Sequence, residues 1–348
     1  MGYVMDHQSI GGRTGYGHSL GRLSALVLML GFGAGCAGGL SEELAPPSEH
    51  FSQKAQRQQT KAMPDGSTFD ETHCAYDPYD AFEPRTRFVR GPWIGECHDT
   101  QKRRPAIHLT KDEAEQFQES EGYYAIANVY HEGAFWYAFV PEGALKHVVF
   151  QLEYFPAVIP AGHTQLRLVY DTPVHLYGQS TWVQNEYRET QNLVFSVEAV
   201  TRRGDQYDLV RGAQEHFAIA FRVTTLEARY QSMVTEQDHH IEQWALEMTE
   251  AERRELLPFY VAESESSGLN YAYHTLFKNC TTDIIRILDG VVQYTWGERV
   301  KRFLVKVTEI YPNIVRAALI ARGLLPLDQS TDWAPLEDDP TFRIQADY

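Results

Sequence analysis

The sequence predicts an α+β fold in which a block of strands forms an antiparallel sheet and a block of helices packs with it. Between residues 123 and 223, short segments rich in Val, Tyr and Phe alternate with turn residues, whereas the composition from residue 225 favours helices. Strands and helices in separate blocks are typical of α+β domains. A length of 348 residues and an apolar fraction of 43% allow a sizeable core.

The strand block contains two segments, residues 151–154 and 165–168, in which polar and apolar side chains alternate, as in half-buried strands. The short connections between segments favour hairpins, and hairpins pair strands in the antiparallel sense. The expected strands are residues 123–130, 134–140, 148–155, 164–170, 193–199 and 217–223.

The helical block has one clear start signal, Thr249 followed by an acidic first turn. Pro312 separates the last two expected helices, because proline interrupts the helical hydrogen-bond pattern. Residues 71–110 are rich in Pro, Asp and Arg and are expected to be irregular. The expected helices are 227–237, 241–246, one that begins after Thr249, 281–288, 300–310 and 314–322.

The amino-terminal segment has the pattern of a bacterial lipoprotein signal. Basic residues precede the apolar run 23–32, which is too short to span a bilayer, and small residues then lead to Cys36. We therefore expect residues 1–35 to be a signal peptide, Cys36 to carry a lipid, and the polar residues 36–70 to form a tether. The alternative is an ordinary secretory signal that is cut nearby.

Charge and the lipid signal together indicate the partners. The net charge of −16 argues against nucleic acid, which requires a basic surface, so the lipid must hold the protein at the membrane. Ala37 after the lipidated cysteine resembles an outer-membrane address. We expect a bacterial envelope protein on the periplasmic face of the outer membrane.

The remaining cysteines fit an oxidising compartment. Cys74 and Cys97 are expected to form a disulfide worth roughly 3 kcal/mol, which leaves Cys280 as a free thiol. His73 and His98 adjoin the two cysteines, so zinc is an alternative, although the short CxxC spacing is missing. In the segment Asp238-His239-His240, two adjacent histidines would point in different directions on a helix, so they would not easily bind one metal ion. No metal site and no cofactor is expected.

Cys280 lies where a helix is expected to begin, just before residues 281–288. Unpaired backbone N–H groups and the helix dipole favour negative charge at this position, so the pKa of the thiol should be lowered. The same groups can stabilise the oxyanion of an acyl transfer. Asn279 and Thr281 are candidates to line this oxyanion pocket, although Asn279 is also in the position of a helix cap. Tyr273 either lines the cleft or packs in the core.

A cysteine nucleophile needs a base that accepts its proton. His163 follows Gly162 at the start of an expected strand, where its ring can face a cleft. A histidine at a strand end is also a common structural residue, so position alone favours it weakly. His175 and Gln179 are the options for a third residue that orients the imidazole.

Two sequence blocks resemble a known family. Residues Gly162-His163-Thr164-x-Leu166-Arg167, and the later Tyr271-x-Tyr273 leading to Asn279-Cys280-Thr281-Thr282, are similar to the signature blocks of the N-terminal periplasmic domain of Lnb-type lipoprotein N-acyltransferases. The resemblance covers about residues 120–290. It implies a circularly permuted papain-like core of the NlpC-type superfamily, within a single catalytic domain of residues 71–348 that ends in a helical extension, 291–348.

The resemblance also implies a mechanism. Cys280 would be the nucleophile that carries an acyl chain as a thioester, and His163 would be the base and acid. The full acyltransferases continue into membrane helices that this sequence does not show, so hydrolysis of a lipid or lipoprotein is expected beside acyl transfer. Two other functions stay open, a papain-like cell-wall peptidase or amidase and a non-catalytic envelope scaffold.

Overall fold

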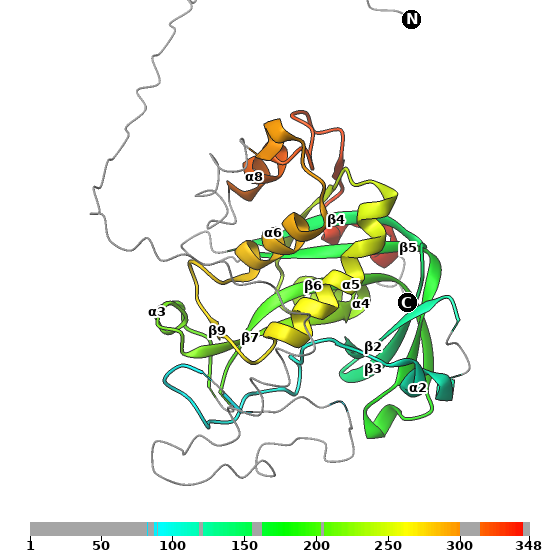
Figure 1. Cartoon of the computed structure of the whole chain (residues 1–348), viewed down its shortest axis with the longest axis vertical. Coiled ribbons are helices and arrows are strands. Elements are labelled where there is room, and N and C mark those ends of the chain that lie inside the picture. Colours follow the sequence, from blue (N-terminus) through cyan, green and yellow to red (C-terminus); the bar gives the residue numbers. More distant parts are fainter. Residues whose placement is uncertain are drawn as a thin grey trace, which may run out of the picture. The chain divides into compact units, whose positions relative to one another are not determined.

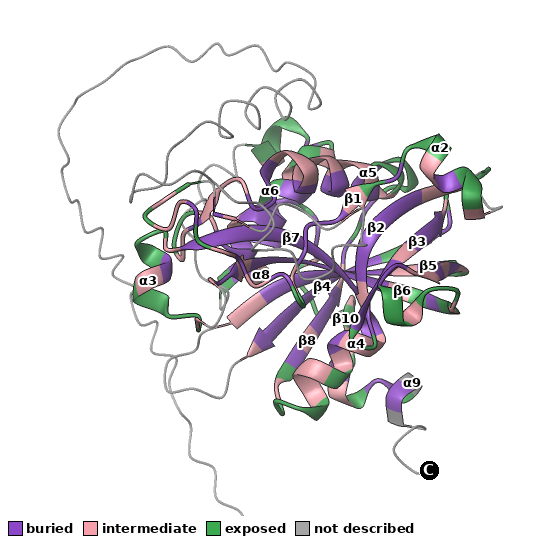
Figure 2. Cartoon of the chain, turned by 90° about the horizontal axis from the view of Figure 1, so that it is seen from below, coloured by how far each residue is buried: buried purple, intermediate pink, exposed green. Residues whose placement is uncertain are grey.

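The computed structural model describes residues 82, 87, 88, 90–117, 121–154, 162–202, 205–299 and 314–343. They form a ten-stranded sheet with helices on both of its faces (Figures 1 and 2). Figure 2 shows α5 and α6 on one side of the sheet and α4 and α9 on the other. The predicted α+β class is therefore confirmed. A permuted papain-like topology remains a prediction.

The strands follow the order β1-β2-β7-β6-β5-β4-β8-β10, while β3 pairs with β2 and β5, and β9 pairs with β7. All six predicted strands are present. The strands are β1 (Ile107–His108), β2 (Tyr123–His131), β3 (Ala134–Pro141), β4 (Leu145–Tyr154), β5 (Gly162–Gly178), β6 (Tyr187–Val200), β7 (Phe217–Thr225), β8 (His240–Ala245), β9 (Ala272–Tyr273) and β10 (Asp332–Trp333).

Helices are concentrated after β6, as predicted. The α-helices are α2 (Lys111–Ala114), α3 (Leu209–Ala213), α4 (Leu226–Tyr230), α5 (Glu250–Ser267), α6 (Cys280–Val291), α8 (Val315–Ala321) and α9 (Pro340–Arg343). Shorter turns are the 3-10 segments Glu115–Phe117, Thr181–Val183 and Leu336–Asp338, and a π-helical turn at Gln231–Thr235 follows α4. The predicted helix 300–310 lies outside the described residues.

Three expectations are wrong. The helix expected at 241–246 is absent, and residues 241–245 belong to strand β8, which pairs along β4 from Val149 with Ala245 to Tyr154 with His240. The sheet is mixed, since β2 and β7 are parallel at Val129 and Val223. The segment after residue 291 is not purely helical, because β10 adds to the edge of β8. Each error has the same cause, a long-range strand pairing that local composition does not encode.

The main core lies between the sheet and the helices α5 and α6. Tyr260 of α5 stacks on Phe195 of β6 with ring centroids 4.2 Å apart, and Ile284 and Leu288 of α6 are fully buried. A smaller cluster around Val194, Leu226 and Ile241 covers the opposite face. Odd and even positions of β6 therefore serve two different layers, as strand geometry requires.

The predicted signal peptide, Cys36, the tether and Cys74 lie outside the described residues. Among the residues that the structure does describe, no helix is long and apolar enough to cross a membrane. The lipid anchor therefore remains a prediction.

Candidate functional site

Cys280 is the first residue of α6, and Asn279 is the residue that caps this helix. The Asn279 side-chain oxygen accepts hydrogen bonds from the backbone N–H groups of Thr281 and Thr282, both at 2.9 Å. The Thr282 hydroxyl in turn accepts from the Asn279 backbone at 2.9 Å. This reciprocal arrangement is a capping box. The Asn279 oxygen thus accepts the hydrogen bonds that cap the helix, and other groups would have to donate hydrogen bonds to a substrate oxyanion.

The sulfur of Cys280 is a buried free thiol with two threonines beside it. The residue is 6% exposed. The Thr281 hydroxyl lies 3.9 Å from Sγ, and the Thr164 hydroxyl of β5 lies 3.4 Å from the Thr281 hydroxyl. The Thr281 hydroxyl thus links Thr164 to the cysteine. The strand residue that meets the cysteine is therefore Thr164.

Burial raises the pKa of the Cys280 thiol above its ordinary value, and the hydrogen bonds from Thr164 and Thr281 offset this only in part. The expectation of a lowered pKa is wrong for this conformation. The helix start is present as predicted, but loss of solvation disfavours the thiolate more strongly than the helix start favours it. The thiol is therefore protonated at neutral pH in the structure described.

Two tyrosines, Tyr207 and Tyr273, lie near the thiol. Tyr273 of β9 is 7% exposed, and its ring meets that of Tyr207 edge-on at 6.0 Å. Tyr207 also lies 3.3 Å from the Thr275 hydroxyl. Burial is the main reason that the pKa of both phenols is raised, and a negative charge on Cys280 would raise it further. Both phenols therefore keep their protons and can donate hydrogen bonds. Tyr273 both packs in the core and borders the thiol.

His163 lies on the opposite face of the sheet. Its Nδ1 is 3.2 Å from an Arg229 nitrogen of α4 and 3.6 Å from a Glu153 oxygen of β4. Thr164, the next residue, faces α6, and consecutive side chains of a strand point to opposite faces. Among the interactions of the described residues, no hydrogen bond or ion pair joins His163 to Cys280. The structure thus does not bring the two predicted catalytic residues together.

The face that holds His163 contains a buried charge network. Arg229 bonds to Glu198 at 3.1 Å and to Gln165 at 2.6 Å, and it lies 3.6 Å from Glu153. Burial alone would raise the pKa of Glu198, but the cations Arg222, Arg229 and Arg103 hold it well below its usual value. These groups stabilise one another, because each buried charge has a partner.

The same network keeps His163 neutral. Burial first, and then the positive charge of Arg229, lower the pKa of His163, and Glu153 opposes them only in part. Arg229 donates to Nδ1, so the ring proton is assigned to Nε2. That Nε2 is buried without a hydrogen-bond partner in the structure. Glu153, which sequence reasoning missed, is the carboxylate beside the imidazole.

The two residues proposed to orient His163 have other contacts. Gln179 bonds to Asn128 through both ends of its amide, at 2.8 Å and 2.7 Å. His175 lies between the rings of Tyr123 and Tyr187. Both side chains are therefore engaged by partners other than His163.

The predicted metal alternatives gain no support from the contacts. His239 bonds to Glu153, whereas His240 bonds to Glu337, so the adjacent histidines diverge. Within the described ranges, no three His, Cys, Asp or Glu side chains are grouped to hold a metal ion. Cys97 is disulfide-bonded, and a disulfide sulfur is not a zinc ligand. Its predicted partner, Cys74, is outside the described residues, so that pairing stays a prediction.

Exposed apolar side chains lie at Tyr207, on α3 and on residues 274–278, the segment that leads to Cys280. Thr275 joins these segments, because its hydroxyl donates to the Leu209 carbonyl at 3.1 Å and its N–H donates to the Gly212 carbonyl at 3.4 Å. We call this set the apolar rim. It comprises Tyr207, Leu209, Val210, Leu276 and Phe277, which are 40–69% exposed.

Sequence alone missed Thr164 and the apolar rim as parts of the site. The signal for Thr164 was available, because residues 165–168 alternate polar and apolar, which places 163 with the polar face and 164 with the apolar one. No local signal marked the rim, because its two segments are distant in sequence. Thr275 and Leu209, which join them, are 66 positions apart.

Comparison with known proteins gives one match. A family model described as the Lnb N-terminal periplasmic domain matches residues 109–310. No curated protein and no solved structure matches the chain.

Proposed function

The chain belongs to the Lnb N-terminal periplasmic domain family, and on this premise we propose that it is a thiol enzyme of the bacterial cell envelope. It would act as an acyltransferase or hydrolase on a lipid or lipoprotein, with Cys280 as the nucleophile. The observation that carries the proposal is a free cysteine at the first position of a capped helix, with the Thr281 hydroxyl beside its sulfur and Thr164 bonded to that hydroxyl.

The proposed chemistry has two steps. The Cys280 sulfur forms a bond to an acyl carbonyl carbon while the ester C–O bond breaks, and the leaving oxygen takes the proton that the thiol gives up. Water or an amine then attacks the thioester and frees the sulfur, which regains a proton. The neutral phenols of Tyr207 and Tyr273 are suited to the oxyanion of each step, because the N–H groups of Thr281 and Thr282 already donate to Asn279.

The apolar rim supports an acyl substrate over a peptide. It provides a surface of exposed Leu, Val, Phe and Tyr side chains. This surface includes Tyr207, whose pKa a negative charge on Cys280 would raise. A cell-wall peptidase would need a polar cleft at the same place. An acyl chain lying along the rim would also displace water from the thiol, and the burial of apolar surface would contribute to binding.

His163 is the proton acceptor in this proposal, and its position sets a condition on that role. In the described conformation Arg229 and Glu153 hold the imidazole on the far face of β5. Because the sheet separates this face from the face of Cys280, proton transfer would require the start of β5 at Gly162 and His163 to turn over when substrate binds, as well as the loss of these contacts.

The non-catalytic scaffold is the second candidate, and a specific observation favours it. The thiol is buried and protonated, and its described contacts include no imidazole. A structural cysteine would have these properties as well. Reactivity must therefore decide between the two functions.

The deciding experiment is intact-mass measurement of the full chain after incubation with phospholipid vesicles or a diacylated lipoprotein. The enzyme proposal expects an acyl adduct that hydroxylamine removes and that Cys280→Ser lacks, with an unchanged melting temperature. The scaffold expects no adduct on wild type under any of these conditions.

A matched pair of variants tests His163. His163 and His239 both contact Glu153, so His163→Gln and His239→Gln disturb the same carboxylate. A proton acceptor at position 163 predicts that only His163→Gln lowers the rate of adduct formation, by about 100-fold or more. Equal effects of the two variants would remove His163 from the mechanism.

We also propose that Cys36 anchors the protein to the outer membrane. The signal-like run before it and the periplasmic family support this location. A Cys36→Ser protein should leave the membrane fraction, and continued co-fractionation with the outer membrane would contradict the anchor.

A further inference from the structure

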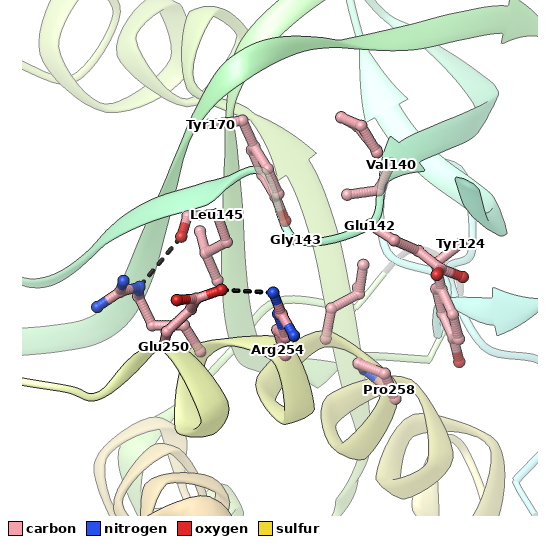
Figure 3. Close-up of a pocket in the computed structure, with 12 residues that line it drawn as sticks. Tyr124, Val140, Glu142, Gly143, Leu145, Tyr170, Glu250, Arg254 and Pro258 are labelled. Atoms are coloured by element: carbon pink, nitrogen blue, oxygen red, sulfur yellow. Dashed lines mark hydrogen bonds and ion pairs between the residues drawn. The ribbon is translucent and has the colours of Figure 1, made fainter. Parts of the chain in front are cut away.

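A cavity lies between the turn that joins β3 to β4 and the first turns of α5 (Figure 3). Its volume is about 450 Å³, within the range of small-molecule sites. Val140, Leu145, Leu257 and Pro258 form its apolar wall. None of its lining residues belongs to the Cys280 site.

Tyr170 places a buried phenol in this cavity. The residue is 3% exposed, and Figure 3 shows its ring reaching from β5 toward Gly143 in the cavity. The phenol oxygen is buried without a hydrogen-bond partner in the structure. A hydroxyl that is buried without a partner is unfavourable, so a ligand atom that bonds to it favours binding.

Arg253 provides a fixed cation in the lining. Its Nε donates to the Leu145 carbonyl at 3.1 Å and its Nη1 to the Met248 carbonyl at 2.6 Å. These bonds orient the guanidinium while leaving Nη2 for another acceptor. No carboxylate lies within ion-pair distance of Arg253 among the residues that the structure describes.

The other charged residues that line the cavity are Glu142 and the pair Glu250–Arg254. Glu250 and Arg254 neutralise each other across one turn of α5, as the dashed line in Figure 3 marks. Glu142 is exposed in the β3–β4 turn and, within the described chain, pairs with no cation. In the described residues, the lining therefore holds Arg253 and Glu142 without counter-ions and the buried, unpaired phenol of Tyr170 beside an apolar wall.

We propose that this cavity binds a small zwitterionic, amphipathic molecule, such as a short peptide with both termini free. The ligand carboxylate would accept from Arg253 and the Tyr170 hydroxyl, its ammonium would face Glu142, and its side chains would cover the apolar wall. A molecule with a single charge would leave one of the two lining charges unmatched, which opposes binding.

The test uses the full chain and the dipeptide leucyl-leucine, with two capped forms as probes. Titration calorimetry should detect the free dipeptide, while N-acetylation, which removes the ammonium, and C-terminal amidation, which removes the carboxylate, should each weaken binding about tenfold or more. Equal affinity for free and capped forms, or no binding of the free dipeptide, would overturn the proposal.

Variants separate the site from a structural role. Tyr170→Phe should weaken binding about tenfold, which corresponds to ~1.4 kcal/mol, without lowering the melting temperature, because the lost hydroxyl has no partner. Glu142→Gln should remove the preference for the free amino group. Tyr154→Phe is the matched control, since that phenol bonds to Glu242 at 3.1 Å outside the cavity. A Tyr170→Phe protein that binds like wild type would contradict the assignment.

Discussion

His163 and Thr164 are neighbours in sequence, but they belong to two different regions of the molecule. Thr164 faces the α6 side, where hydroxyls and phenols lie around the neutral thiol of Cys280. His163 faces the α4 side, where Arg229 joins Glu153 and Glu198 in a buried charge network. One residue along a strand is therefore enough to separate the nucleophile from its predicted base. The α6 side has the reactive group, and the α4 side has the charges.

The largest effect should come from the α4 side. Arg229→Met would leave Glu153 with the imidazoles of His163 and His239 but no arginine, and an uncompensated buried charge costs about 3–5 kcal/mol. Glu198 would keep Arg222 and Arg103. Urea denaturation measures this loss in the free energy of unfolding. The control is Arg254→Met, which breaks the exposed pair with Glu250 and should cost less than ~1 kcal/mol. Comparable losses would mean that the α4 network is not a stabilising unit.

A smaller effect is expected at the start of α6. Asn279→Ala removes the side-chain cap and should cost about 1 kcal/mol, because two backbone N–H groups lose their acceptor. Thr249→Ala removes the equivalent cap of α5 and is the matched control for stability.

Only Asn279→Ala should also change the rate at which iodoacetamide labels Cys280. Wild type should react slowly at pH 7 and faster as the pH rises past 9, since burial raises the pKa of the thiol. Identical labelling rates in the two cap variants would show that the helix start does not influence the sulfur.

The smallest effects are opposite pH dependences of the two sides. The pKa of His163 is lowered from 6.5, so the unfolded chain binds a proton first as the pH falls, and stability declines below about pH 6.5. The pKa of Cys280 is raised from 9.0, so the unfolded chain loses its proton first, and stability declines as the pH rises above about 9. His163→Gln should flatten the acid decline and Cys280→Ser the alkaline one, by urea denaturation across pH. If either variant flattened both declines, the two groups would be coupled through the sheet.

The sequence by itself determined the locally encoded features. Six strands, the Thr249 cap and the start of a helix at Cys280 follow from alternation and capping, which depend on neighbours a few positions away. It also led to the family through two blocks that lie within the matched residues 109–310. The free state of Cys280 followed from the pairing expected of the other cysteines, and the thiol is indeed free.

Only the tertiary structure decided which groups meet. Residues 241–245 form part of β8 because they pair with β4, and the parallel contact of β2 with β7 joins segments that are distant in sequence. The pKa of Cys280 moved up rather than down, because the surrounding core excludes water from a helix start that by itself favours the thiolate. Local patterns set the position and direction of each side chain along its element, whereas desolvation and pairing depend on the elements that the fold places against it.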